Sequence, residues 1–130
     1  MRLLVMLVLL AVGVIHLLPL VGVLGADRLQ TLYGIAIEGP DLQILMRHRA
    51  VLFGLLGSLM AVAAFRPSLQ AVAIVMGLVS VLSFLALALG VSGYGDPVAR
   101  IVLADTVALP CLVAAALVKW RRPGPAVDMG

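Results

Sequence analysis

The sequence predicts an all-α integral membrane protein, an antiparallel bundle of four membrane-spanning helices with a short amphipathic segment in its first, outer connection. Hydrophobic residues make up 64% of the 130 residues, charged residues only 12%, and the mean hydropathy is +1.24. Soluble domains contain about 45–50% apolar and about 25% charged residues. A soluble domain this short could not enclose so much apolar side chain, because small domains leave a large share of their surface in water.

Four apolar segments are each long enough to cross the hydrocarbon core of a bilayer, which takes about 20 helical residues. They run over Leu3–Leu24, Leu42–Phe65, Leu69–Val91 and Pro97–Trp120. We interpret residues 1–122 as one transmembrane domain and residues 123–130 as a flexible tail. The first segment is longer than the usual apolar core of a secretory signal, so we expect it to be retained as a helix.

Polar residues mark the predicted ends of these helices. Asp41, Ser68 and Asp96 precede the second, third and fourth segments, where a side-chain oxygen can accept from the free amides of a first helical turn. In the outer connection, Asp27 to Gly34 has the pattern of a short amphipathic helix, capped by its aspartate and ended by its glycine. We expect this helix to be a connector resting at the membrane surface rather than a functional lid.

Basic residues are unevenly shared between the two ends of the predicted bundle. The flanks of one end carry only Arg28 and Arg100. The other end carries Arg2, Arg66, Lys119, Arg121 and Arg122. Because cytoplasmic loops hold the excess of Lys and Arg, we expect a bacterial inner-membrane protein with both termini in the cytoplasm. The net charge of +3 is then matched by membrane lipids with anionic headgroups and not by nucleic acid.

Each predicted span places one polar residue at a similar depth. His16, Arg49, Ser83 and Asp105 each lie about eight residues from the outer end of their span, roughly 12 Å deep. Charged groups in hydrocarbon are costly and normally face protein or water. We therefore expect Arg49 and Asp105 to neutralise each other, with His16 joining them as a donor and an acceptor. Pro19 removes a backbone hydrogen bond next to this layer.

This layer predicts a polar pocket that opens toward the outer side. The expected ligand-binding residues are His16, His48, Arg49 and Asp105. The expected accessory residues are Arg47, Ser83 and Tyr33. Adjacent helical residues point about 100° apart, so at least one residue of the Arg-His-Arg run faces the interior. A purely structural hydrogen bond for His16, or a counter-ion role for Asp105, is the competing interpretation.

No metal, cofactor or catalytic residue is predicted. The one cysteine, Cys111, rules out an internal disulfide and a multi-cysteine cluster. The histidines and the buried acid lack the helical spacing of a metal-binding motif. Gly54, Gly57, Ser58 and Ala61 form a small-residue face on the second span, which we expect to pack inside the bundle, with a homo-oligomer contact as the alternative.

Four stretches carry a resemblance to a known group of proteins: GVIHLLP at 13–19, LYG at 32–34, LMRHRAVLFG at 45–54 and VLAD at 102–105. With them the chain resembles small bacterial four-span membrane proteins whose arrangement is DoxX-like. Members are often labelled phosphopantetheine adenylyltransferase. That enzyme needs a nucleotide-binding α/β domain, and no soluble segment of this sequence is long enough to form one. The resemblance implies a four-helix membrane bundle and no particular activity.

We interpret the chain as a membrane protein that binds a small amphipathic or anionic molecule, such as a lipid or quinone headgroup. Arg49 would hold this ligand and His16 would polarise it. Two alternatives stay open. The chain could be a structural or accessory subunit of a membrane complex, whose polar layer only fixes helix register. It could also be a small redox or isomerising enzyme in which His16 and Asp105 form an acid–base pair.

Overall fold

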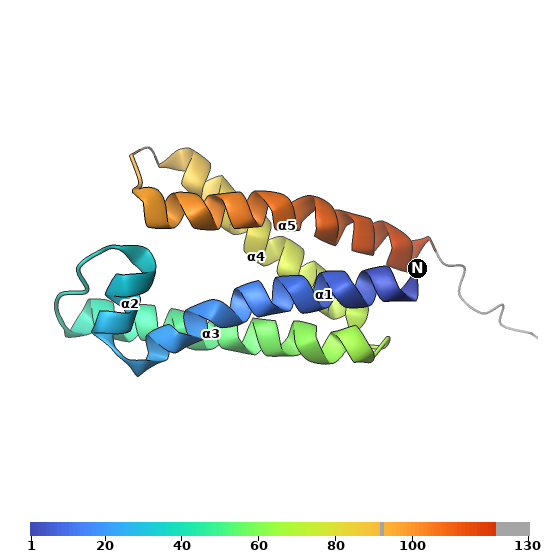
Figure 1. Cartoon of the computed structure of the whole chain (residues 1–130), viewed down its shortest axis with the longest axis horizontal. Helices are drawn as coiled ribbons and strands as arrows, with labels where there is room; N and C mark the ends of the chain where they lie inside the picture. Colours follow the sequence, from blue (N-terminus) through green and yellow to red (C-terminus); the bar gives the residue numbers. More distant parts are fainter. Residues whose placement is uncertain (92, 122–130) are drawn as a thin grey trace, which may run out of the picture.

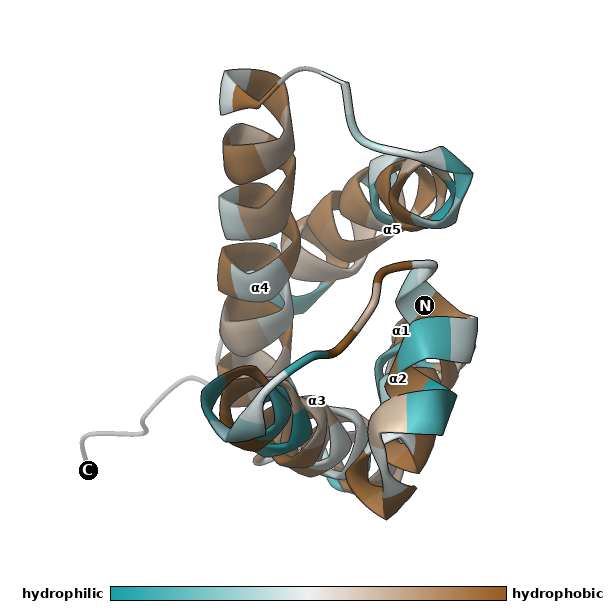
Figure 2. Cartoon of the chain, turned by 90° about the vertical axis from the view of Figure 1, so that its left-hand side faces the viewer, coloured by the Kyte–Doolittle hydropathy of each residue, from teal (hydrophilic) through white to brown (hydrophobic). Residues whose placement is uncertain are grey.

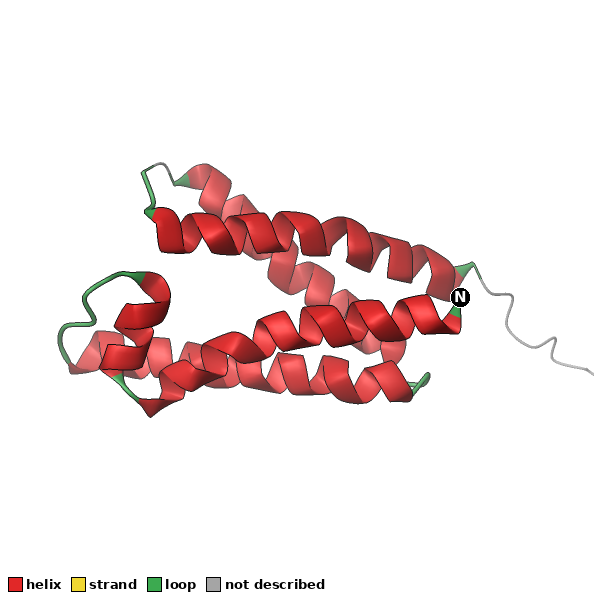
Figure 3. Cartoon of the chain, viewed as in Figure 1, coloured by secondary structure: helices red, strands yellow, loops and turns green. Residues whose placement is uncertain are grey.

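The computed structural model describes residues 1–91 and 93–121. All regular secondary structure in these residues is helical, and they form no strand (Figure 3). The elements are α1 (Arg2–Leu17), the 3-10 helix η1 (Leu18–Leu24), α2 (Ala26–Tyr33), α3 (Pro40–Phe65), α4 (Gln70–Gly90) and α5 (Asp96–Trp120). The tail predicted over residues 123–130 lies outside the described residues.

Four helical segments in the described part of the chain are long and apolar enough to cross a membrane. They are Arg2–Leu24, Pro40–Phe65, Gln70–Gly90 and Asp96–Trp120. Each predicted span begins and ends within two residues of the observed one. The predicted fold class is therefore confirmed, and the chain is a multi-pass membrane protein with an all-α bundle.

The predicted capping side chains do not cap their helices. The N-cap positions of α2, α3, α4 and α5 make no side-chain cap hydrogen bond. The capping expected of Asp27, Asp41, Ser68 and Asp96 is therefore wrong. α3 begins at Pro40 and α5 has Pro97 in its first turn, where the missing N–H has no intrahelical partner to lose. Asp41 and Asp96 lie within the first turns, where a negative charge still favours the helix N-terminus.

The first span changes from an α-helix to the tighter η1 at Leu18. Pro19 has no N–H to donate to the carbonyl of Ile15, so the α-helical hydrogen-bond ladder is interrupted there. Near the end of η1, the Val23 carbonyl accepts a hydrogen bond of 2.9 Å from Nε of Arg47. Arg47 therefore fixes the end of the first span against α3.

α1 and α3 pack with their backbones close together along small residues. A Cβ added at Gly57 would lie 2.8 Å from the carbonyl oxygen of Gly13. A Cβ added at Gly54 would lie 2.5 Å from Cδ1 of Leu20 in η1. Both α3 glycines thus face the first span inside the bundle, as predicted, whereas Ser58 of the same small-residue set is exposed.

α4 and α5 form a second helix pair. The two pairs converge at the end that carries the N-terminus and separate toward the end that carries α2 (Figure 1). The main core lies at the convergent end, and many of its members are alanines, which let the helices approach closely. These core residues are Val5, Leu9, Val12, Met60, Ala63, Ala64, Ala73, Ile74, Val81, Ala108, Leu112, Ala115 and Ala116.

α2 covers the end at which the two pairs separate. Leu29 and Tyr33 on its inner face form a second buried cluster with Ile37. Gly34 ends α2 with a φ of 65°, and a Cβ there would lie 2.6 Å from Cγ of Pro97 in α5. Figure 2 looks onto this end and shows hydrophilic residues on the outer side of α2. The apolar face of α2 therefore packs on the protein, so the segment does more than rest at the interface as a connector.

Replacing Gly57 with alanine tests the packing of α1 on α3. The added methyl group would overlap the Gly13 carbonyl, and overpacking of this kind costs about 1–3 kcal/mol. We expect Gly57→Ala to lower the thermal unfolding temperature of the detergent-solubilised protein. Gly90→Ala is the control, because a Cβ at Gly90, the last residue of α4, has no atom within 4 Å. Equal unfolding temperatures for the two variants would contradict this packing.

Candidate functional site

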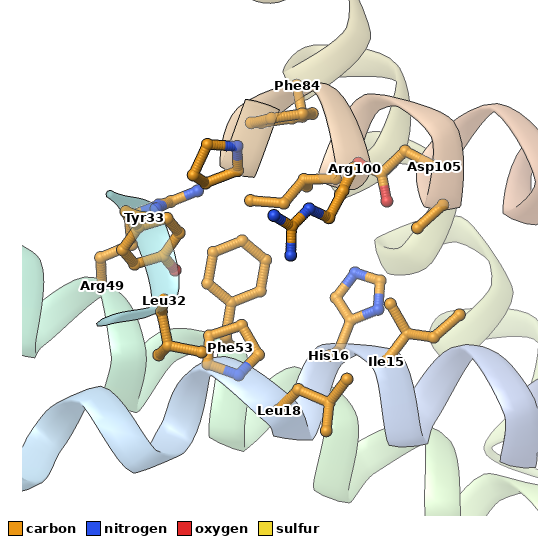
Figure 4. Close-up of a pocket in the computed structure, with 14 residues that line it drawn as sticks. Ile15, His16, Leu18, Leu32, Tyr33, Arg49, Phe53, Phe84, Arg100 and Asp105 are labelled. Carbon is orange, nitrogen blue, oxygen red and sulfur yellow. The ribbon is translucent and has the colours of Figure 1, made fainter. Parts of the chain in front are cut away.

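A cavity of about 380 Å³ lies between the two helix pairs at the end covered by α2 (Figure 4). All five α-helices and η1 contribute to its wall. Its apolar lining residues are Ile15, Leu18, Pro19, Leu32, Phe53, Phe84, Pro97, Ile101 and Ala104. Its polar lining residues are His16, Tyr33, Arg49, Arg100 and Asp105. An apolar wall with a few convergent polar groups is typical of sites for small molecules.

His16 is buried, with 3% of its surface exposed, and both of its ring nitrogens have protein partners. Nδ1 lies 2.9 Å from the Val12 carbonyl, which can only accept, so Nδ1 carries a proton and donates it. In a neutral ring Nε2 then accepts from the hydroxyl of Ser80, 3.2 Å away on α4. His16 therefore joins the first span to α4, as the structural interpretation of this residue predicts.

Asp105 is the second buried polar residue on the wall, with 7% of its surface exposed. None of the side-chain hydrogen bonds formed within the described residues involves its carboxylate. In this part of the chain, every side-chain nitrogen or oxygen that is inaccessible to solvent has a hydrogen-bond partner. Because the Asp105 oxygens have no such partner, they must be accessible. They reach the cavity, toward which the side chain points from α5 (Figure 4).

Arg49 lies on the cavity wall with its guanidinium stacked on two aromatic rings. Its Cζ is 5.1 Å from the ring centroid of Tyr33 in α2 and 4.9 Å from that of Phe53 in α3. Both distances fall in the range of cation–π attraction. Arg49 and Asp105 occupy opposite sides of the cavity in Figure 4 and do not form the direct ion pair that we expected.

Arg100 is a cavity residue that the sequence analysis placed only at the flank of a span. Its guanidinium points toward the middle of the cavity (Figure 4). Arg100 and Ala104 are four residues apart on α5, and Asp105 follows directly, so this part of the helix presents them toward the same space. That spacing was the signal in the sequence that could have identified Arg100.

Three other predicted residues stay outside the cavity. His48 is exposed, because it lies about 100° around α3 from Arg49. Ser83 is also exposed, and its hydroxyl donates to the Ser80 carbonyl of its own helix at 3.0 Å. Arg47 binds the Val23 carbonyl instead of a site residue. The predicted layer thus contributes His16, Arg49 and Asp105, with Tyr33 from α2, and Ser80 takes the place expected for Ser83.

Comparisons of the chain with protein-family models, with curated proteins and with solved structures find no match. Within residues 1–91 and 93–121, no group of three or more His, Cys, Asp or Glu side chains could hold a metal ion. The structure alone defines the class of this protein. It is a multi-pass membrane bundle with a cavity, partly apolar and partly charged, beneath the short helix α2.

The hydrogen bond between His16 and Ser80 can be tested by comparing two serine variants of α4. Ser80→Ala leaves Nε2 of a buried histidine without its partner, which costs about 1–3 kcal/mol. Ser83→Ala removes an exposed hydroxyl and should change the free energy of unfolding by no more than about 0.5 kcal/mol. Thermal unfolding in detergent measures both. If Ser83→Ala were the more damaging variant, the assignment of Ser80 as the partner of His16 would fail.

Proposed function

We propose that the cavity binds the headgroup of a small amphipathic molecule from the membrane. The observation that carries this proposal is Asp105, a buried carboxylate with accessible oxygens and no protein hydrogen bond within the described residues. A buried carboxylate without a partner is costly. A ligand that donates a hydrogen bond to Asp105 would offset that cost.

The other polar groups on the wall narrow the chemistry of the headgroup. Arg49 and Arg100 can only donate hydrogen bonds, whereas an ionised Asp105 can only accept them. A headgroup with both hydroxyl donors and oxygen acceptors would satisfy all three side chains. The aromatic rings of Phe53 and Phe84 favour a flat, ring-shaped group. A quinol ring has these properties, and we take it as the model headgroup.

A lipid phosphate is the second source of such a headgroup. It would be attracted by Arg49 and Arg100 but repelled by an ionised Asp105 on the same wall. This opposition favours the ring over the phosphate. It also separates the two sources by experiment, because removal of the Asp105 charge should act on them in opposite directions.

The hydrogen bonds of His16 argue against the expectation that it polarises the ligand. Because both ring nitrogens are engaged, His16 has no free nitrogen with which to polarise a ligand. The same engagement weighs against an acid–base pair of His16 and Asp105. It supports a structural part for His16, as an accessory-subunit interpretation requires, but that interpretation leaves the free carboxylate of Asp105 unexplained.

Asp105→Leu tests the proposed function. We expect the chain-free benzoquinol, kept reduced, to bind at least about tenfold more weakly, because a hydrogen bond to a charged group contributes about 1.5–3 kcal/mol. The unfolding temperature should stay the same or rise, since an unpaired buried charge is removed. Asp96→Leu, an exposed position of the same helix, is the control. Isothermal titration calorimetry measures binding in detergent.

Three other results would change the interpretation of Asp105. Binding of a short-chain anionic phospholipid that strengthens in Asp105→Leu would identify a lipid phosphate as the headgroup. Unchanged quinol binding in Asp105→Leu would show that the carboxylate does not bind the headgroup. A large loss of stability would show that the carboxylate has a structural role. Either of these last two results would refute the proposal.

We also propose that the resemblance to DoxX-like bundles reflects a shared site. All four stretches that carry the resemblance contribute to the cavity wall, and their lining residues come from five elements, α1, η1, α2, α3 and α5. Residues 13–19 supply His16, residues 32–34 supply Tyr33, residues 45–54 supply Arg49 and residues 102–105 supply Asp105. This convergence supports a common binding role for these stretches.

We further propose that both termini are cytoplasmic in a bacterial inner membrane. Support comes from Arg2, Arg66 and Lys119, which belong to the same end of the bundle, opposite α2. In a Cys111→Ser background, Glu38→Cys should react with a membrane-impermeant maleimide on spheroplasts. Ser68→Cys should react only after the membrane is opened, and the reverse pattern would overturn this orientation.

A further inference from the structure

A second, smaller hollow adjoins the cavity. It has a volume of about 210 Å³ and lies between α3 and α4. We call it the α3–α4 groove, and its lining residues are Arg49, Leu52, Phe53, Leu56 and Ser80. Arg49 and Phe53 also line the cavity, so these two side chains border both spaces.

The α3–α4 groove has an apolar character and opens to the outside of the bundle. Leu52, Leu56 and Phe53 supply most of its wall. The hydroxyl of Ser80 already donates its proton to His16, so it has none left for a ligand. Leu52 is 51% exposed on a helix that spans the membrane, which places the mouth of the groove toward hydrocarbon.

Two other sides of the cavity are tightly packed. The first span lies against α3 at Gly13 and Gly57, where not even a Cβ fits without a shift. Above the cavity, α2 reaches α5 through the contact of Gly34 with Pro97. A hydrocarbon chain that passed α2 would also enter water, whereas one that passed between α3 and α4 would stay in an apolar medium.

We propose that the ligand is a single amphiphile whose headgroup occupies the cavity and whose hydrocarbon chain passes Arg49 and Phe53 into the α3–α4 groove. This inference rests on the proposed function. The stacked guanidinium of Arg49 marks the boundary between the headgroup and the chain, because its charged edge can face the polar space while Phe53 faces the apolar one. The ligand class is therefore a chain-bearing membrane amphiphile and not a free water-soluble ring.

Filling the groove tests this inference with two probes, the chain-free benzoquinol and the same benzoquinol with a decyl chain. Leu52→Trp should weaken binding of the decyl compound by roughly tenfold, because the packing of several methylene groups is lost, and leave the chain-free compound unchanged. Leu55→Trp is the matched control, since Leu55 is 64% exposed on the same helix and lines neither space. It should bind both compounds like the original protein.

The two proposals fail in different ways in this experiment. If Leu52→Trp binds the decyl compound as tightly as Leu55→Trp does, while the chain-free compound still binds, the route of the chain is wrong and the proposed function stands. If the chain-free compound binds to none of the three proteins, both proposals are overturned. Thermal unfolding of each variant confirms that its bundle is intact.

Photocrosslinking gives a second measurement that needs no substitution. A decyl benzoquinol with a diazirine at the end of its chain should label the α3 segment around Leu52 and Leu56 in the original protein. Labelling confined to α1 or α5 would overturn the proposed route.

Discussion

The close contact between the α1 and α3 backbones sets the geometry on which the rest of the bundle depends. At Gly13 and Gly57 neither helix carries a Cβ, so the backbones meet where any side chain would hold them apart. Farther along, η1 turns past Gly54, and Arg47 attaches its end to α3. The first span and α3 therefore act as one unit, and the α4–α5 pair packs against this unit in the alanine-rich core. The cavity lies where the two units part.

The polar groups within the spans differ in whether the protein itself supplies their partners. In hydrocarbon a polar group needs a partner, and His16 finds two within the protein, one on its own helix and one on α4. Arg49 obtains its stabilisation from two aromatic rings. Asp105 differs, because its oxygens face space and not a protein donor. A group that the fold leaves unsatisfied is a better indication of ligand binding than a group that the fold satisfies, and this contrast is the basis of the proposed function.

α2 completes the enclosure of the cavity with few residues. Its buried face holds Tyr33 against Arg49, and its C-terminal glycine meets Pro97 of the opposite helix pair. Gly34 suits this place because its positive φ and the nearby proline both exclude a side chain. With α2 over the polar end, the α3–α4 groove is the apolar side of the same space, which agrees with a ligand that has a polar head and a hydrocarbon chain.

The sequence by itself determined the membrane class, the four spans and the position of each polar residue along its span. These properties depend on hydropathy and on distance along a helix, both of which are local. It also identified His16, Arg49 and Asp105, because a polar residue inside an apolar run is visible without knowledge of its neighbours. The small residues of α3 likewise indicated close packing before their partner helix was known.

Only the tertiary structure decided which of these groups meet. Depth along a span does not define rotation about its axis, so Ser80 and Ser83, or His48 and Arg49, could not be told apart by depth alone. Only the fold brings Tyr33 of α2 against Arg49, and the inward direction of Arg100 depends on how far the two helix pairs separate. That separation arises from glycine and alanine contacts at the other end of the bundle. Such contacts join residues that are far apart in the sequence, so a local sequence pattern cannot predict them.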